Sequence, residues 1–421
     1  MRSRAVRHAG RCIGLVAIVG VPGAAYAQDV QTSVVASVGG SAESNPYNDT
    51  NSHGAAVAAT ADVRGTVVAR DDRTTVDVTG WASFRQFLRR YGLEDSYGVN
   101  TDISSRQSDR LTLRGSGSFS YSVGGFSGYG RPSLSPVDPT SIIPDPTQPD
   151  PLAGLNPLTG LSDANILGQR TRFTSYGSGV GADMQLGARS SASLDLSARA
   201  LRFALTSYDD YNTYSGQLQL NHRLDELFSV GLIGTLTKTN YLSLRQGDAR
   251  TAELLASVDR RLGSHWSLNL GLGASFTKID GRGGLPDTNF TALSARLRFC
   301  WQDESSNLCL GALRSPQPAA DGNVRVSDTL TADYSLRLSA RENLSVSGAY
   351  SRTGRGRTAA IGGGAPAIDF VNASVRYDNQ ISKKLTAFVA SNFSKSITSG
   401  LRRRPNVGIS MGLQVRIGTG Q

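Results

Sequence analysis

The side chains that could carry covalent chemistry are few, and they are poorly placed for it. The chain of 421 residues has four histidines. His53 falls in a long connector, His222 at the end of a predicted strand and His265 in a short turn. None stands at a spacing from a serine and an acid or amide that suggests a nucleophilic triad. Metal-ligand spacings and phosphate-binding glycine loops are also missing, so we predict no enzyme, no cofactor and no metal site.

Two cysteines form a second possible chemical pair. Cys300 and Cys309 flank a predicted turn at 302–307. In strands that alternate apolar and polar residues, both fall on the polar face of neighbouring strands, which would suit a cross-strand disulfide in an oxidising compartment. The alternative is a pair of free thiols without a role.

The largest set of reactive groups consists of charged side chains at alternate positions of predicted strands. Arginines outnumber acids in this set. In a water-filled pore such side chains tune selectivity, and an excess of arginine favours anions or acidic polymers. The alternative is that arginine and aspartate on adjacent strands pair across the wall and only stabilise it. The candidate lumen-lining residues are Arg64, Arg85, Arg114, Arg223, Arg261, Arg296, Arg298, Arg337, Arg416, Asp62 and Asp259.

The segment 250–277 shows what positions these side chains. Apolar residues such as Leu268, Leu270 and Leu272 alternate with small or polar ones, and a period of two predicts a strand with two different faces. Each run has about the length of a tilted strand that crosses a membrane. Unpaired backbone groups in lipid cost several kcal/mol each, so the pattern requires repetition until the sheet closes.

The same alternation recurs along the chain about eighteen times, with sixteen and twenty strands as alternatives. Four of the predicted strands span 74–90, 111–123, 228–241 and 308–313. Short and long connectors alternate between the strands, as periplasmic turns and extracellular loops do in outer-membrane barrels. The sequence therefore predicts an all-β, transmembrane, antiparallel up-and-down barrel of the Gram-negative outer membrane, with both termini in the periplasm.

The first 27 residues have the pattern of a secretory signal peptide. A basic start precedes an apolar stretch too short to span a bilayer, and a small-x-small site predicts cleavage between Ala27 and Gln28. The barrel would then comprise residues 28–421. The formal net charge of +10 falls to +6 without the four arginines of this segment, and the remaining arginines are dispersed, so nucleic acid is not a predicted partner.

One insertion, 124–172, interrupts the strand pattern. It is rich in proline, which removes donors and blocks strand pairing. Asp138, Asp145 and Asp150 each precede a proline there. We predict an extracellular loop long enough to fold into the mouth as a constriction. The alternative is a mobile surface loop.

The expected partners follow from the membrane location. Basic clusters at 402–404, at 352–357 and at 89–90 lie at predicted extracellular strand ends and could hold lipopolysaccharide phosphates. Other outer-membrane lipids would surround the barrel. The amphipathic strand at 407–417 is the kind of segment that the barrel assembly machinery recognises. Nothing in the sequence decides between a monomer and a trimer.

The start of the predicted barrel resembles a known family. Residues 34–40 (VVASVGG) and 43–47 (ESNPY) are similar to the first strand and first loop of the β-barrel porin 2 family of Gram-negative bacteria. The resemblance implies an outer-membrane conduit that works with polysaccharide export proteins. Three functions remain open: a conduit for surface polysaccharide, a general or anion-preferring diffusion porin, and a structural or adhesive barrel without a channel.

Overall fold

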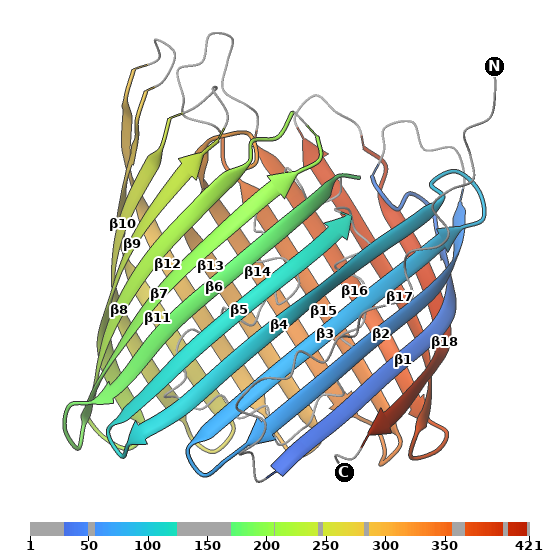
Figure 1. The fold of residues 1–421 in the computed structure, drawn as a ribbon, viewed down its shortest axis with the longest axis horizontal. Helices are drawn as coiled ribbons and strands as arrows, with labels where there is room; N and C mark the ends of the chain where they lie inside the picture. Colours follow the sequence, from blue (N-terminus) through green and yellow to red (C-terminus); the bar gives the residue numbers. More distant parts are fainter. Residues whose placement is uncertain are drawn as a thin grey trace.

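The described part of the chain forms one closed β-barrel. The computed structural model describes residues 29–48, 55–123, 170–205, 207–242, 247–281, 286–355, 367–398 and 403–418. Eighteen antiparallel strands make a single sheet (Figure 1). β1 pairs with both β2 and β18, so the sheet has no free outer edge. The predicted all-β barrel of about eighteen strands is confirmed.

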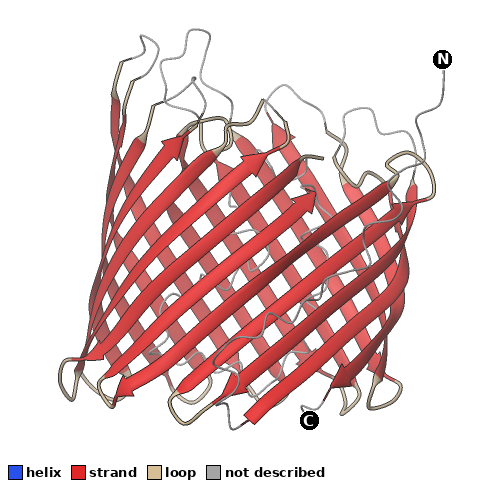
Figure 2. Ribbon diagram, viewed as in Figure 1, coloured by secondary structure: helices blue, strands red, loops and turns tan. Residues whose placement is uncertain are grey.

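The strands are β1 (Asp29–Glu43), β2 (Ala56–Arg70), β3 (Thr74–Phe87), β4 (Leu93–Ser108), β5 (Leu111–Val123), β6 (Arg172–Gln185), β7 (Ser190–Phe203), β8 (Tyr211–Arg223), β9 (Phe228–Tyr241), β10 (Ala249–Leu262), β11 (Trp266–Ile279), β12 (Thr288–Gln302), β13 (Ser306–Pro318), β14 (Val324–Arg337), β15 (Glu342–Thr353), β16 (Ile368–Gln380), β17 (Leu385–Thr398) and β18 (Asn406–Gly418). Figure 2 shows strands joined by loops and turns and no helix in the described residues. None of these residues belongs to a helix long and apolar enough to cross a membrane.

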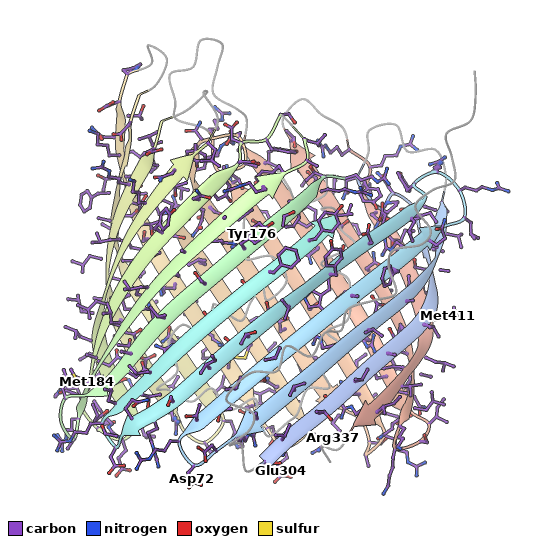
Figure 3. The ribbon with its side chains drawn as sticks, in the orientation of Figure 1. Asp72, Tyr176, Met184, Glu304, Arg337 and Met411 are labelled. Carbon is purple, nitrogen blue, oxygen red and sulfur yellow. A yellow bond between two sulfur atoms is a disulfide. The ribbon has the colours of Figure 1, made fainter. Side chains whose placement is uncertain are left out.

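The alternation of side chains separates an apolar outer face from a polar inner face. Tyr176 and Met184 of β6 and Met411 of β18 point outward in Figure 3 and are about half exposed. Their neighbours along the strands are small or polar and point inward. Closure satisfies the backbone within the sheet, and the exposed apolar belt matches the hydrocarbon of a bilayer. The protein is therefore an integral β-barrel of the bacterial outer membrane.

The two edges of the barrel differ. Tight turns connect the strands along the lower edge in Figure 1, whereas the longer connectors lie along the upper edge. The first described strand begins at the short-turn edge and the last one ends there. We use the names short-turn edge and long-loop edge below.

The predicted strand at 308–313 is too short. β13 continues to Pro318, because Pro316 and Pro318 still lie opposite residues of β14. Pairing of β13 with β12 ends at Arg314. The prolines thus lie where β13 has only one neighbour, and a missing donor is tolerated on an unpaired side.

The predicted strand at 74–90 is too long. β3 ends at Phe87, and the next residues turn back towards β4. Arg90 and Gly92 have φ angles of 77° and 71°. That left-handed conformation ends strand pairing. The alternation already breaks at Gln86 and Phe87, where a polar residue falls on the outer face and an aromatic one on the inner face.

Candidate functional site

Every residue predicted to line the lumen lies on the inner face. Each is flanked along its strand by residues of the outer face, as Arg64 is by Val63 and Arg114 is by Leu113, both of which are exposed. The predicted residues nevertheless fall into two groups. One group lies away from the short-turn edge, where several arginines contact acids, and the other lies at or near the short-turn edge.

The mid-wall arginines are neutralised by nearby carboxylates. Nε of Arg114 lies 2.7 Å from Asp183, and a terminal nitrogen of Arg114 lies 3.0 Å from Asp195. Arg296 lies 3.2 Å from Glu253 in a largely buried pair. For these arginines the alternative holds that arginine and acid pair across the wall and stabilise it. Their charge is offset locally and contributes little to the field in the lumen.

The pair of Arg85 and Glu43 is the most buried of these contacts. The two side chains are only 8% and 4% exposed, with 2.9 Å between nitrogen and oxygen. Asp62 accepts hydrogen bonds from the hydroxyls of Ser37 and Ser83. This part of the inner wall therefore consists of a polar network on β1, β2 and β3.

Two further predicted features lie on the inner face near the short-turn edge. Cys300 of β12 and Cys309 of β13 lie directly opposite each other and are joined by a disulfide. Nε of Arg298 donates to Sγ of Cys300 at 3.4 Å, and Asp259 accepts from the side-chain amide of Asn269. Among the described residues no cluster of His, Cys, Asp or Glu could hold a metal ion.

A backbone contact recurs around the short-turn edge. On every second strand from β4 to β18, a residue near the strand end donates its N–H to the carbonyl of the residue that precedes the neighbouring strand. The donors are Arg106, Gln185, Arg223, Arg261, Gln302, Arg337, Gln380 and Arg416, and the acceptors in the same order are Arg73, Arg110, Arg189, Leu227, His265, Ser305, Arg341 and Lys384. Asp29 and Arg70 occupy the corresponding opposed positions on β1 and β2. These residues form one layer around the barrel, which we call the basic ring.

Positive charge dominates the basic ring. Ten arginines and one lysine occupy it, and Asp29 is its single acid. Arg223 and Arg337 donate to the carbonyls of Ala188 and Glu304 rather than to carboxylates, and Figure 3 shows Arg337 beside Glu304 at this edge. Within the described residues no cation of the ring forms a salt bridge.

Acids also occur at this edge, but outside the ring. They lie in the short turns themselves, beyond the ends of the strands, as Figure 3 shows for Asp72. These turn acids are Asp71, Asp72, Asp109, Asp225, Glu226, Asp303 and Glu304. Several are occupied by turn backbone groups, such as Asp225, which accepts from the N–H of Leu227 at 2.7 Å. The ring is thus a basic layer inside an edge of mixed charge.

The long-loop mouth is narrowed by the connector between β13 and β14. The carbonyl of Ala320 accepts from the N–H of Asp209 at 2.7 Å, and the carbonyl of Asn323 accepts from the hydroxyl of Tyr241. Ala320 is fully buried and packs in one cluster with inner-face residues of β6 to β12 such as Phe290. Residues 319–323 therefore cross the mouth to strands that are not their neighbours. The sequence predicts only a long connector at 315–322.

A second inward fold involves the motif that carries the family resemblance. The N–H of Asn45 donates to the side chain of Asn406 at 2.9 Å, and the amide of Asn48 donates to Ser394 at 3.4 Å. Tyr47 is 1% exposed and packs edge-on against Tyr91. The segment 45–48 thus packs against the inner face of the mouth where the first and last strands meet.

Some residues of the site were missed or cannot be placed. Arg376 lies on the inner face, 4.2 Å above the ring of Phe388, and donates to Asp378 at 2.8 Å. It escaped the sequence analysis because Phe370 interrupts the polar pattern of that strand face, whereas the Asn372-Ser374-Arg376 spacing carried the signal. Among the described residues, Arg170 at the end of the 124–172 insertion binds Glu94 at 3.0 Å. Asp138, Asp145, Asp150, Ala27 and Gln28 lie outside the described residues.

Comparison with known proteins adds only a general likeness. Neither a scan against protein-family models nor a search of curated sequences finds a match, so the resemblance to the β-barrel porin 2 family stays a prediction. Similar solved structures include OprD of Pseudomonas aeruginosa (10% identity, 94% of this chain and 97% of the other, TM-score 0.44). Others are a BenF-like porin of Pseudomonas fluorescens and OpdK of P. aeruginosa (each 12% identity, 94% and 100%, TM-score 0.46). The function of this chain is therefore inferred from its own residues.

Proposed function

We propose that this barrel is a water-filled diffusion channel that prefers small anionic solutes. The observation that carries the proposal is the basic ring, a complete layer of the wall in which cations greatly outnumber acids. A closed barrel of sixteen to eighteen strands is wide enough to leave an aqueous channel. Rings of arginine and lysine in such channels favour anions.

The ring is a better source of selectivity than the rest of the wall. Away from the ring, the inner-face arginines Arg85, Arg114 and Arg296 face carboxylates within 3.2 Å, so their fields largely cancel. The ring cations have no such partners among the described residues, and their like charges add in the confined mouth. Because the Debye length is only about 8 Å at physiological ionic strength, the preference should weaken as salt is raised.

The opening at the long-loop edge limits the size of the solute. Residues 319–323 and 45–48 both fold inward and are held by buried contacts. Two fixed obstructions narrow the opening, which favours passage of small molecules over that of a polymer. If the long loops are extracellular, as they are in outer-membrane barrels, solutes meet these obstructions before they reach the basic ring.

The alternative functions lack an observation in their favour. A polysaccharide conduit and its export partners follow only from the family resemblance, and the inward-folded segments argue against a polymer path. A structural barrel without a channel would have no need for a basic ring on its inner face. Loss of the gene with unchanged surface polysaccharide would remove the conduit hypothesis.

Liposome swelling tests the proposal. Purified barrel should admit small dicarboxylates faster than neutral solutes of the same size, and neutral solutes faster than matched diamines. The difference should shrink at high ionic strength because the ring is screened. Equal rates for all three solutes would contradict anion preference, and the absence of any swelling would contradict the channel itself.

A further inference from the structure

Three cations form a row on the outer face at the long-loop edge. Arg250 of β10 lies directly opposite Lys238 of β9 on one side and Lys278 of β11 on the other. All three share a strand face with exposed apolar residues, which are Leu236 for Lys238, Leu254 for Arg250 and Phe276 for Lys278, and therefore point outward. Like charges directly opposite each other destabilise a sheet, so the isolated fold offers no reason for this row.

Only one member of the row is neutralised. The ammonium of Lys278 lies 3.0 Å from Asp287 and 3.6 Å from Asp280. In the connector, the backbone N–H of Gly281 and the ammonium of Lys278 hold the pKa of Asp287 below its ordinary value, so that carboxylate stays charged. Among the described residues, Lys238 and Arg250 have no carboxylate partner.

A second charged row at the same edge shows the contrast. On β13 to β16 the outward residues Arg314, Asp328, Arg352 and Asp369 lie opposite one another in turn. Their signs alternate, with 2.7 Å between Arg314 and Asp328 and 3.6 Å between Arg352 and Asp369. That row neutralises itself, whereas in the row on β9 to β11 only Lys278 is paired with acids among the described residues.

The positive row borders a groove of about 1030 Å³ on the outer face. Leu236 and Phe276 line the groove beside Lys238 and Lys278, two residues nearer the middle of the barrel, and are 68% and 60% exposed. Tyr214 of β8 borders it on one side. The groove therefore combines cations at the level of the membrane edge with apolar side chains at the level of the hydrocarbon.

We propose that this groove binds a phosphorylated saccharolipid of the outer leaflet, the lipid A part of lipopolysaccharide. A phosphate on the sugar head would contact Lys238 and Arg250, and acyl chains would lie along Leu236 and Phe276. Arginine suits this role because its guanidinium binds phosphate with two parallel hydrogen bonds. The inference rests on the proposed orientation, in which the long-loop edge is extracellular and the cations lie at the outer leaflet.

The site differs from the basic clusters that the sequence suggested. Arg352 of the 352–357 cluster is taken by Asp369, and Arg402 of the 402–404 cluster lies outside the described residues. The row on β9 to β11 went unnoticed because its members stand on three separate strands and become neighbours only through strand pairing.

Lipid binding by the purified full-length barrel tests the inference. Native mass spectrometry with bisphosphorylated lipid A in neutral detergent should show a bound lipid, and lipid A without its phosphates should bind much more weakly. The double variant Lys238→Ala and Arg250→Ala should lose about tenfold or more in affinity, since each change removes a hydrogen bond to a charged group. Lys395→Ala, which removes a single outward cation from β17, should bind as the native protein does.

Three results would overturn the inference. These are unchanged binding in the double variant, equal binding of the dephosphorylated lipid, and equally tight binding of phosphatidylglycerol, which would show a site for any phosphate headgroup. Heat-modifiable gel migration reports folding of each variant. Anion preference of the pore should be unchanged in the double variant, because both residues face the outside, so failure here is distinguishable from failure of the proposed channel.

Discussion

At the scale of single residues, the face on which a side chain lies decides what it can do. The alternation of a strand predicts that face from the sequence alone. It could not assign partners, because the register between distant strands is not written in the local pattern. Arg114, for example, meets Asp183 and Asp195 only because β5, β6 and β7 pair as they do.

Neighbouring arginines on β10 give a matched test of the basic ring. Arg261 belongs to the ring, whereas Arg260 points outward over Phe228, with 5.9 Å from its guanidinium carbon to the ring centre. Arg261→Gln should lower the anion-to-cation permeability ratio about fivefold at low salt, because one charge at about 8 Å in water attracts an anion and repels a cation by about 0.5 kcal/mol each. Arg260→Gln should leave the ratio unchanged. Equal effects of the two substitutions on reversal potentials would contradict the role of the ring.

At the scale of elements, local pattern predicted the strands well but not their departures from the wall. The predicted limits of β5 and β9 agree with the structure at both ends. The predicted limits of β13 are wrong. Beyond Arg314, the hairpin of β13 and β14 separates from β12 and turns into the mouth. That departure is stabilised by packing of Ala320 and Val324 against β6 to β12, a long-range contact that no alternation within β13 indicates.

Removing the inward connector tests its effect on the pore. Replacement of residues 319–323 by two glycines should raise the single-channel conductance, because the segment crosses the mouth. Exchanging Gly263 and Ser264 for another tight-turn pair at the short-turn edge serves as the control and should leave conductance as it is. If conductance is the same in both variants and the native barrel, these residues do not limit the opening.

The seam between the first and last strands depends on a buried ion pair. Glu43 contacts Arg85 and also accepts from the amide of Asn406 at 3.0 Å. Glu43→Gln would leave the guanidinium without a charged partner, and breaking a buried pair typically costs about 3 kcal/mol or more. Asp328→Asn at an exposed pair should cost only about 1 kcal/mol or less. Urea unfolding in lipid vesicles measures both, and equal losses would contradict a special role for the seam.

At the scale of the whole molecule, the basic ring appears only when the sheet closes. Each strand contributes a single position, and the contributing residues range from Asp29 to Arg416. The sequence held one usable signal, since an arginine or glutamine stands at the inner position near the end of every second strand from β2 to β18. Recognising it requires that all strand ends be aligned at one edge, which depends on the closed topology rather than on any local segment.

The reversal potential of the native barrel in a planar bilayer tests the channel and its selectivity together. With potassium chloride at different concentrations on the two sides, the uncompensated arginines of the ring should make the current anion-selective, more strongly at low than at high salt. Current that reverses on the cation-selective side, or a bilayer that shows no channel conductance after insertion is verified, would contradict the proposed function.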